Sequence, residues 1–170
     1  EELVNGVLRL ASHTAPEMAE VDLDAVAADV LEGLRETIAA TGAHVEVADL
    51  GTVRGDAAQL GVVLQNLVGN GCKFSRPGVA PVVRVRAVDG AAGRRVEVLD
   101  NGPGVPPEEA QAIFQLFHRA SGAEGHGIGL SSVAVVVQAH GGTCGVEPNP
   151  QGPGSCFWFE LPRGGDPTAA

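Results

Sequence analysis

Residues 94–100, RRVEVLD, alternate as a half-buried β-strand does, and the strand ends on an acid followed by NGPG. Val96, Val98 and Asp100 share one face of such a strand, the face that would be turned towards the core. A carboxylate buried there needs a hydrogen-bond donor, because burying it unpaired is costly. An exocyclic amino group such as that of adenine would serve, and glycines at 102 and 104 would let a flat ring approach the backbone. The alternative is an acid that only starts a turn by bonding to its own backbone.

The rest of the chain alternates between helical and strand-like patterns. We expect helices at 1–11, 21–42, 56–74, 107–117 and 130–142, and strands at 44–50, 81–88, 94–100, 143–148 and 155–162. The helix at 21–42 would begin at Asp22 or Asp24 and end at Gly42, and Asp56 would cap the next helix. The order of elements predicts an α+β fold, a two-layer sandwich with helices on one face of a mixed, mostly antiparallel sheet.

Charge and cysteine content exclude several kinds of function. A formal net charge of −10 argues against a surface for nucleic acid or an anionic membrane. Cys72, Cys144 and Cys156 are an odd number without a CxxC pair, so reduced intracellular thiols are expected rather than a zinc site or a disulfide framework. No apolar run approaches the roughly 20 residues of a transmembrane helix. The chain opens within a helical pattern and without Met, from which we expect a piece of a longer protein.

Two further motifs could bind an anionic ligand. Asn66 and Asn70 are four residues apart and therefore lie on one face of the helix at 56–74, followed by Lys73. Two amide oxygens can join a hard divalent ion, and a nearby lysine can meet phosphate, although two solvated asparagines would look the same. GHGIGL, residues 125–130, precedes an apolar helix whose N-terminal N–H groups would suit a phosphate; the alternative is a plain glycine loop.

Taken in order, these motifs resemble the catalytic and ATP-binding domain of sensor histidine kinases, of the Bergerat-fold superfamily shared with gyrase-type ATPases. NLVGNGCKF resembles the family's N box, DNGPG its first G box, IFQLF its F box and GHGIGL its second G box. HGG and GSCFWFELP resemble the helix end and the last strand that follow. The likeness runs from about residue 20 to Pro162.

The resemblance implies a role for each matching residue, with ATP and Mg²⁺ as cofactors. Asp100 would accept a hydrogen bond from the adenine amino group in a pocket shaped by Gly102 and Gly104. Asn66 and Asn70 would bind Mg²⁺. The phosphate side would be formed by Lys73, Gly127, Gly129 and Leu130, the lid over about 118–127 would hinge at Phe114 and Phe117, and Arg119 would stabilise the transferring γ-phosphoryl group.

One difference from gyrase-type relatives and two departures from the family pattern bear on this function. Gyrase-type relatives carry a water-activating Glu where Asn66 stands, and an amide cannot act as a general base, so transfer to another nucleophile is expected rather than hydrolysis. The family usually has Ala at Gly71, and Thr or Ser at His126, for which we expect no catalytic role.

The phosphoacceptor histidine is expected to lie outside this chain. SHTAPE offers His13 but neither the acid nor the basic residue of the family's acceptor motif. We therefore divide the chain into the tail of a dimerisation helix with a linker (1–19), the ATP-binding kinase domain (20–162) and a disordered tail (163–170).

The resemblance also implies the partners: the dimerisation domain of the same kinase, a response regulator and, for the full-length kinase, a second copy. Neither nucleic acid nor direct membrane contact is expected of this piece, which would be cytoplasmic even where the whole kinase is membrane-anchored. Two alternatives remain open. One is an anti-sigma-type serine kinase, whose members generally carry Glu at the Asn66 position. The other is a degenerate nucleotide-binding module that only binds a partner.

Overall fold

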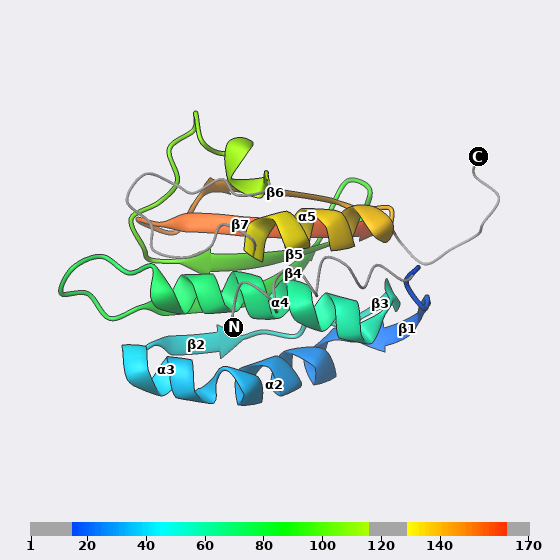
Figure 1. Cartoon of the computed structure of the whole chain (residues 1–170), viewed down its shortest axis with the longest axis horizontal. Coiled ribbons are helices and arrows are strands. Elements are labelled where there is room, and N and C mark those ends of the chain that lie inside the picture. Colours follow the sequence, from blue (N-terminus) through cyan, green and yellow to red (C-terminus); the bar gives the residue numbers. More distant parts are fainter. Residues whose placement is uncertain (1–14, 116–128, 163–170) are drawn as a thin grey trace.

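The computed structural model describes residues 15–115 and 129–162, and its centre is a five-stranded sheet (Figure 1). The strands lie in the order β2-β4-β5-β7-β6; β2 pairs with β4 in parallel, and every other pair is antiparallel. Their bounds are β2 His44–Val47, β4 Val82–Asp89, β5 Gly93–Asp100, β6 Thr143–Pro148 and β7 Ser155–Pro162. The predicted strands are all present, and β4 and β5 form an antiparallel hairpin.

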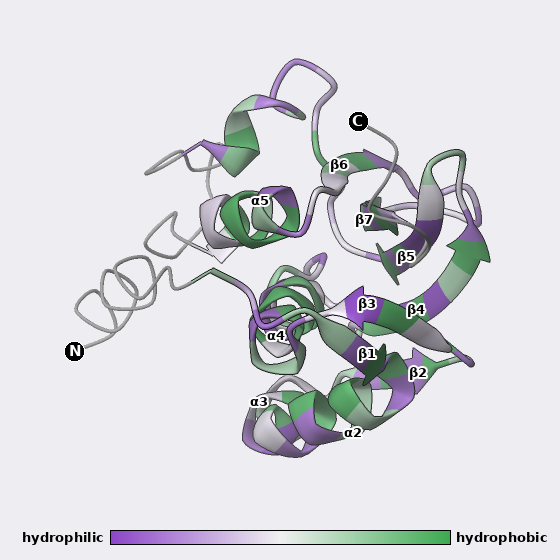
Figure 2. Ribbon diagram, turned by 90° about the vertical axis from the view of Figure 1, so that its right-hand side faces the viewer, coloured by the Kyte–Doolittle hydropathy of each residue, from purple (hydrophilic) through white to green (hydrophobic). Residues whose placement is uncertain are grey.

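Helices cover one face of this sheet, as Figure 2 shows edge-on. They are α2 Leu23–Gly33, α3 Arg35–Thr41, α4 Ala57–Lys73 and α5 Gly129–Ala139. α4 lies centrally, with Leu60, Val63, Leu64 and Leu67 almost fully buried, and α5 packs beside it through Val133 and Val137. The buried residues of these helices lie in the hydrophobic core, and the two-layer α+β sandwich is confirmed.

The expected helix at 21–42 is interrupted. α2 starts after Asp22, whose Oδ1 accepts from the backbone N–H of Asp24, and it ends next to Leu34, where α3 begins. Leu34 is buried and non-helical, so its side chain packs into the core at the break. Gly42 ends α3 with a φ of 67°, as its position in the sequence indicated.

Two short strands were not expected from the sequence. β1 (Ala19–Asp22) and β3 (Thr52–Gly55) pair in an antiparallel, two-stranded sheet. β1 lies partly in the segment interpreted as a linker. Such short strands carry too few alternating residues for the pattern to be visible.

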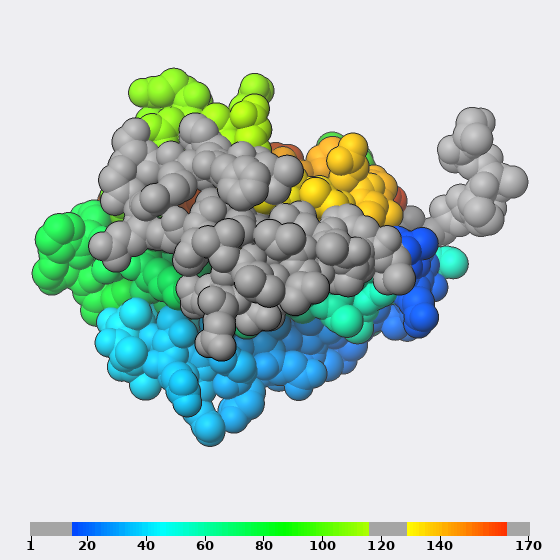
Figure 3. Space-filling model, viewed as in Figure 1, coloured from blue at the N-terminus to red at the C-terminus, as the bar shows by residue number. Residues whose placement is uncertain are grey.

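The prediction of a helix at 107–117 is wrong for the residues that the structure describes. Residues 107–111 form turns, and only Ala112–Phe114 form a short 3₁₀ helix, η1. Ile113 is buried in the core and anchors this irregular segment, which rises at the top of the molecule in Figures 1 and 3. The predictions for residues 1–14, 116–128 and 163–170 lie outside the described residues. No helix within the described ranges has the length and apolar character to cross a bilayer.

The opposite face of the sheet carries polar side chains. Glu97 on β5 lies 2.7 Å from Arg86 and 3.0 Å from Arg95, and the guanidinium of Arg95 stacks over the ring of Trp158 on β7. Trp158 in turn lies where a Cβ on Gly145 of β6 would stand, 2.7 Å from the ring, so only glycine fits beneath it. A central strand can thus be buried on both faces while only one faces the apolar core.

Candidate nucleotide-binding site

Asp100 ends β5 at the edge of the core, where the residue is 7% exposed. Its Oδ1 accepts two backbone hydrogen bonds, from Gly102 at 2.8 Å and from Ser155 at 3.2 Å. Among the described residues no hydrogen bond reaches Oδ2, so this oxygen is available to a ligand. Burial raises the pKa of Asp100, and the two backbone N–H groups offset this only in part. Asp100 therefore does bond to the turn that follows it, as the alternative interpretation proposed. This contact uses Oδ1 only and does not use Oδ2.

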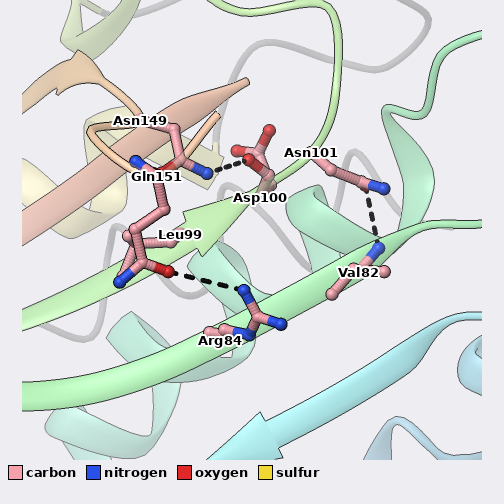
Figure 4. A pocket seen from close by; sticks show the side chains of 7 residues that line it. All are labelled: Val82, Arg84, Leu99, Asp100, Asn101, Asn149 and Gln151. Carbon is pink, nitrogen blue, oxygen red and sulfur yellow. Dashed lines mark hydrogen bonds between the residues drawn. The ribbon is translucent and has the colours of Figure 1, made fainter. Parts of the chain in front are cut away.

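Two residues of the β6–β7 turn contact the backbone carbonyl of Asp100. Nδ2 of Asn149 donates to the carbonyl of Asp100 at 2.8 Å (Figure 4). Gly154, with a φ of 109°, passes so close to this carbonyl that a Cβ would collide with it. Asn149 and Ser155 were not identified from the sequence, because they lie about 50 residues downstream of Asp100.

The residue after Asp100 joins the loop at the end of α4 to the sheet. Oδ1 of Asn101 accepts from the backbone N–H of Val82, and its Nδ2 donates to the carbonyl of Ala80. Nε of Arg76 donates to the carbonyl of Asn101. This loop, which projects to the left in Figure 1, is therefore tied to the segment that carries Asp100.

Three glycines keep backbone and side chains close around the carboxylate. A Cβ on Gly102 would collide with the carbonyl of Phe74 and lie 2.9 Å from Oδ1 of Asp100. Gly104 has a φ of 84°, which favours glycine. Gly71 passes over β4, and a Cβ there would lie 2.8 Å from Cγ2 of Val83 and 3.6 Å from Cβ of Asp100. Gly71, where the family usually has Ala, therefore leaves room for the side chain of Val83 on β4.

α4 carries the three polar residues predicted to meet metal and phosphate. Nδ2 of Asn66 donates to the carbonyl of Val62 at 2.8 Å, which leaves its Oδ1 directed away from its own helix. Asn70 is half-buried, and Lys73 is exposed in the last turn. A hard cation binds oxygen, and among the described residues no hydrogen bond reaches Oδ1 of Asn66, so this donor set fits Mg²⁺.

The start of α5 approaches α4 at this point. A Cβ on Gly129 would lie 2.7 Å from Oδ1 of Asn66, so the structure brings this residue of the GHGIGL motif next to the NLVGNGCKF motif. Leu130 follows in the first turn and is half-buried. Phe114 lies in η1, partly buried against the core. The predicted site residues Phe117, Arg119 and Gly127 lie outside the described residues, as do His126 and the lid at 118–127.

Comparisons with known proteins identify the family. The pattern of the family described as histidine kinase-, DNA gyrase B- and HSP90-like ATPase matches residues 55–165. The signal transduction histidine-protein kinase/phosphatase MprB of Mycobacterium avium (strain 104) is 41% identical over 114 residues, which cover 64% of this chain and 22% of that protein. The phytochrome-like protein Cph1 of Synechocystis sp. is 33% identical over 146 residues, covering 84% of this chain and 19% of Cph1. The chain thus spans about a fifth of the length of these relatives.

Solved structures agree with the sequence relatives. A mycobacterial sensor histidine kinase MprB structure superposes with a TM-score of 0.73 at 33% identity, covering 85% of this chain and 97% of that one. Full-length ShkA in complex with AMPPNP gives a TM-score of 0.80 at 32% identity, covering 95% of this chain and 35% of ShkA. The chain therefore belongs to the histidine kinase-, DNA gyrase B- and HSP90-like ATPase family, and it has the ATP-binding catalytic domain of sensor histidine kinases.

Proposed function

We propose that this chain binds ATP with Mg²⁺ and transfers the γ-phosphoryl group to a histidine on the dimerisation domain of its kinase. The observation that carries the proposal is the buried carboxyl of Asp100, whose Oδ1 is held by two backbone N–H groups while Oδ2 is left to a ligand. A carboxylate so placed selects a base with an exocyclic amino group, as adenine has. ShkA, a structural relative, is described as a complex with AMPPNP.

The remaining roles are those that the family motifs imply. Asn66 and Asn70 would hold Mg²⁺, which supplies charge neutralisation to the phosphates when it is bound. The other ligand contacts would come from Gly102 and Gly104 at the base, and from Lys73, Gly127, Gly129 and Leu130 at the phosphates. Arg119 would stabilise charge on the transferring group, and Phe114 and Phe117 would hinge the lid.

Asn66 favours transfer over hydrolysis. A carboxamide cannot take a proton from water, so no general base stands at the position that activates water in gyrase-type relatives. With an acceptor histidine in line, the bond between the γ-phosphorus and the ADP oxygen breaks and a bond from phosphorus to an imidazole nitrogen forms. ADP leaves, and the chain's own side chains need only bind and orient.

The proposed partners follow from the same reaction. The acceptor would belong to a dimerisation domain. Residues 1–19 would be the tail of its helix and a linker, and residues 20–162 would form the separate catalytic module. The phosphoryl group would then pass to a response regulator; one structural relative, ThkA, is described in complex with the response regulator TrrA. A full-length homodimer would place one catalytic module beside each acceptor helix.

Calorimetric titration of ATP into the wild-type chain and into Asp100→Asn, each with and without Mg²⁺, tests the binding step. We expect the wild type to bind, Mg²⁺ to change its titration, and Asp100→Asn to lose most of the affinity. A folded wild type, checked by circular dichroism, that binds no ATP would contradict the proposal. The transfer step is tested by adding a dimerisation domain with an acceptor histidine and following its labelling from γ-³²P-ATP, with the His→Ala acceptor as control.

A further inference from the structure

α4 and α5 also meet at a second place, far from the nucleotide site. His140 follows the last residue of α5 and is 4% exposed. Its Nδ1 lies 2.8 Å from the carbonyl of Val136, and its Nε2 lies 3.0 Å from the backbone N of Asp56, the cap of α4. A carbonyl only accepts and an amide N–H only donates, so the ring is neutral and carries its hydrogen on Nδ1.

The ring fits into a site formed by the residues before α4. A Cβ on Gly55 would lie 2.7 Å from Cδ1 of Leu60 and 3.1 Å from Cδ2 of His140, so any larger residue here would crowd both side chains. The carboxylate of Asp56 joins two more segments: Oδ1 accepts from the N–H of Gln59 within α4, and Oδ2 accepts from the N–H of Glu17. We call Glu17, Gly55, Asp56 and His140 the His140 junction. It joins the end of α5, the start of α4 and the chain that enters β1.

The junction lies at the start of α4 and the end of α5, whereas Asn66 lies beyond the middle of α4 and Gly129 at the start of α5. Asn66 is ten residues after Asp56, and Gly129 is eleven residues before His140. At about 1.5 Å per residue, these ten and eleven residues each span roughly 15–17 Å along the helix axis. The two helices run antiparallel. The junction fixes the two helices at one end of their shared contact, which continues past Val133 and Val137 to the point where Gly129 faces Oδ1 of Asn66. A change of angle at one end changes the separation at the other.

We propose that His140 is a positioning residue for the nucleotide site. As a neutral imidazole it fixes the end of α5 to the cap of α4, and this sets the spacing between Gly129 and Asn66 at which the metal–phosphate group is bound. The inference rests on the proposed function for the identity of that ligand. The link from Asp56 to Glu17 extends the same contact to the chain that enters the domain, so a displacement of that chain would be transmitted to α4.

Three variants separate positioning from simple stability. His140→Leu removes both hydrogen bonds, and His140→Gln restores an acceptor for the N–H of Asp56. Val137→Ala, one turn earlier in α5, removes buried methyl groups without touching the junction. The dissociation constant of Mg²⁺–AMPPNP is measured for each at a temperature where all three are folded. We expect His140→Leu to bind at least about fivefold more weakly than wild type, and Val137→Ala and His140→Gln to stay within about twofold.

The outcomes distinguish this inference from the proposed function. If the wild type binds and His140→Leu binds equally well, or if Val137→Ala loses as much affinity, the positioning role is overturned. If the wild type binds no nucleotide, the proposed function fails, and the junction is then tested by NMR without ligand. The ¹⁵N shifts of His140 must show a protonated Nδ1 and an unprotonated Nε2. The amide signal of Gly129 must move in His140→Leu and stay in place in Val137→Ala; the opposite result overturns the inference.

Discussion

Oδ1 of Asp100 accepts a hydrogen bond from the backbone N–H of Ser155, a residue 55 positions later in the chain, at 3.2 Å. The contact is possible because β5 and β7 are neighbours and the β6–β7 turn brings Ser155 against the end of β5. Within the part of the chain that the structure describes, every hydrogen bond to this carboxyl group therefore comes from the main chain. Replacing its side chain by one of the same shape should keep the surrounding structure.

The first prediction concerns Asp100→Asn. The Asn oxygen can still accept from Gly102 and Ser155, but its amino group replaces the free acceptor Oδ2, so we expect nucleotide affinity to fall about 10–100-fold. We expect stability to be kept, because burial disfavours the charged form of Asp100. Calorimetry gives the affinity, and thermal unfolding gives the stability.

The pH dependence of the same pair provides a check. The pKa of Asp100 is raised in the folded state, so over the pH range from its unfolded value of about 4 to its folded value the native chain holds a proton that the unfolded chain loses. Stability from this group therefore falls as pH rises through that range. As the pH rises above 4, the melting temperature of Asp100→Asn should increase relative to that of wild type. A mutant clearly less stable than wild type at pH 7 would count against this.

The second prediction concerns the contact between α5 and α4. In Gly129→Ala the new methyl would lie 2.7 Å from Oδ1 of Asn66, the mobile end of that side chain, and would turn the amide away. Ala suits a helix better than Gly, so the fold should not suffer. We expect the Mg²⁺-dependent part of nucleotide affinity to fall on the order of tenfold in titrations with and without Mg²⁺.

Gly61→Ala is the matched control for that variant. It is also a Gly-to-Ala change within a helix, but its Cβ would lie 3.7 Å from Cγ1 of Val26, an ordinary contact. Its Mg²⁺-dependent affinity should equal that of wild type. Equal affinities for all three proteins would show that Gly129 does not set the position of Asn66.

The third prediction concerns Gly71, which packs on Val83. Gly71→Ala would force a methyl to 2.8 Å from Cγ2 of Val83, and overpacking of this kind costs about 1–3 kcal/mol. We expect a lower melting temperature than wild type. The double variant Gly71→Ala/Val83→Ala should recover part of the loss relative to the sum of the two single variants. Additive effects in this double-mutant cycle would mean that the two side chains do not compete for the same space.

The fourth prediction concerns the cysteines. Burial raises the pKa of Cys144 to about 11, and burial together with the nearby Glu97 carboxylate raises that of Cys156 to about 11. At pH 8 the thiolate fraction of either is then about two orders of magnitude below that of a free cysteine, whose pKa is about 8.5. Alkylation followed by mass spectrometry should be slow in the folded protein and fast in denaturant. Rapid modification of Cys144 at pH 8 in the native state would contradict the assignment.

The sequence predicted the parts of the fold that repeat within a short stretch. The alternation in 94–100 identified β5 and the burial of Asp100, and Asp56 was recognised as a helix cap from its place before an apolar stripe. The break at Leu34 and the strands β1 and β3 depend on packing between distant segments, which short-range patterns do not contain.

The same distinction holds for the site. Asp100, Asn66 and Gly129 were identifiable because their motifs are local. Asn149 and Ser155, which hold Asp100 in place, belong to a turn whose residue types are common in turns of any kind. His140 was recognisable as part of a helix end, but its bond to Asp56 joins residues 84 positions apart.

The pairing of β5 with β7 also determines when during synthesis the domain can become functional. Val96 of β5 pairs with Phe159, so the central strand of the sheet lacks one neighbour until the chain has been made almost to Pro162. Contacts so distant in sequence form slowly and late. Until then Asp100 lacks the N–H of Ser155 and its main chain lacks the side chain of Asn149. A nascent chain shorter than this would hold the motifs that recognise a nucleotide without the means to orient them, so the kinase domain can become competent only once its last strand has been added.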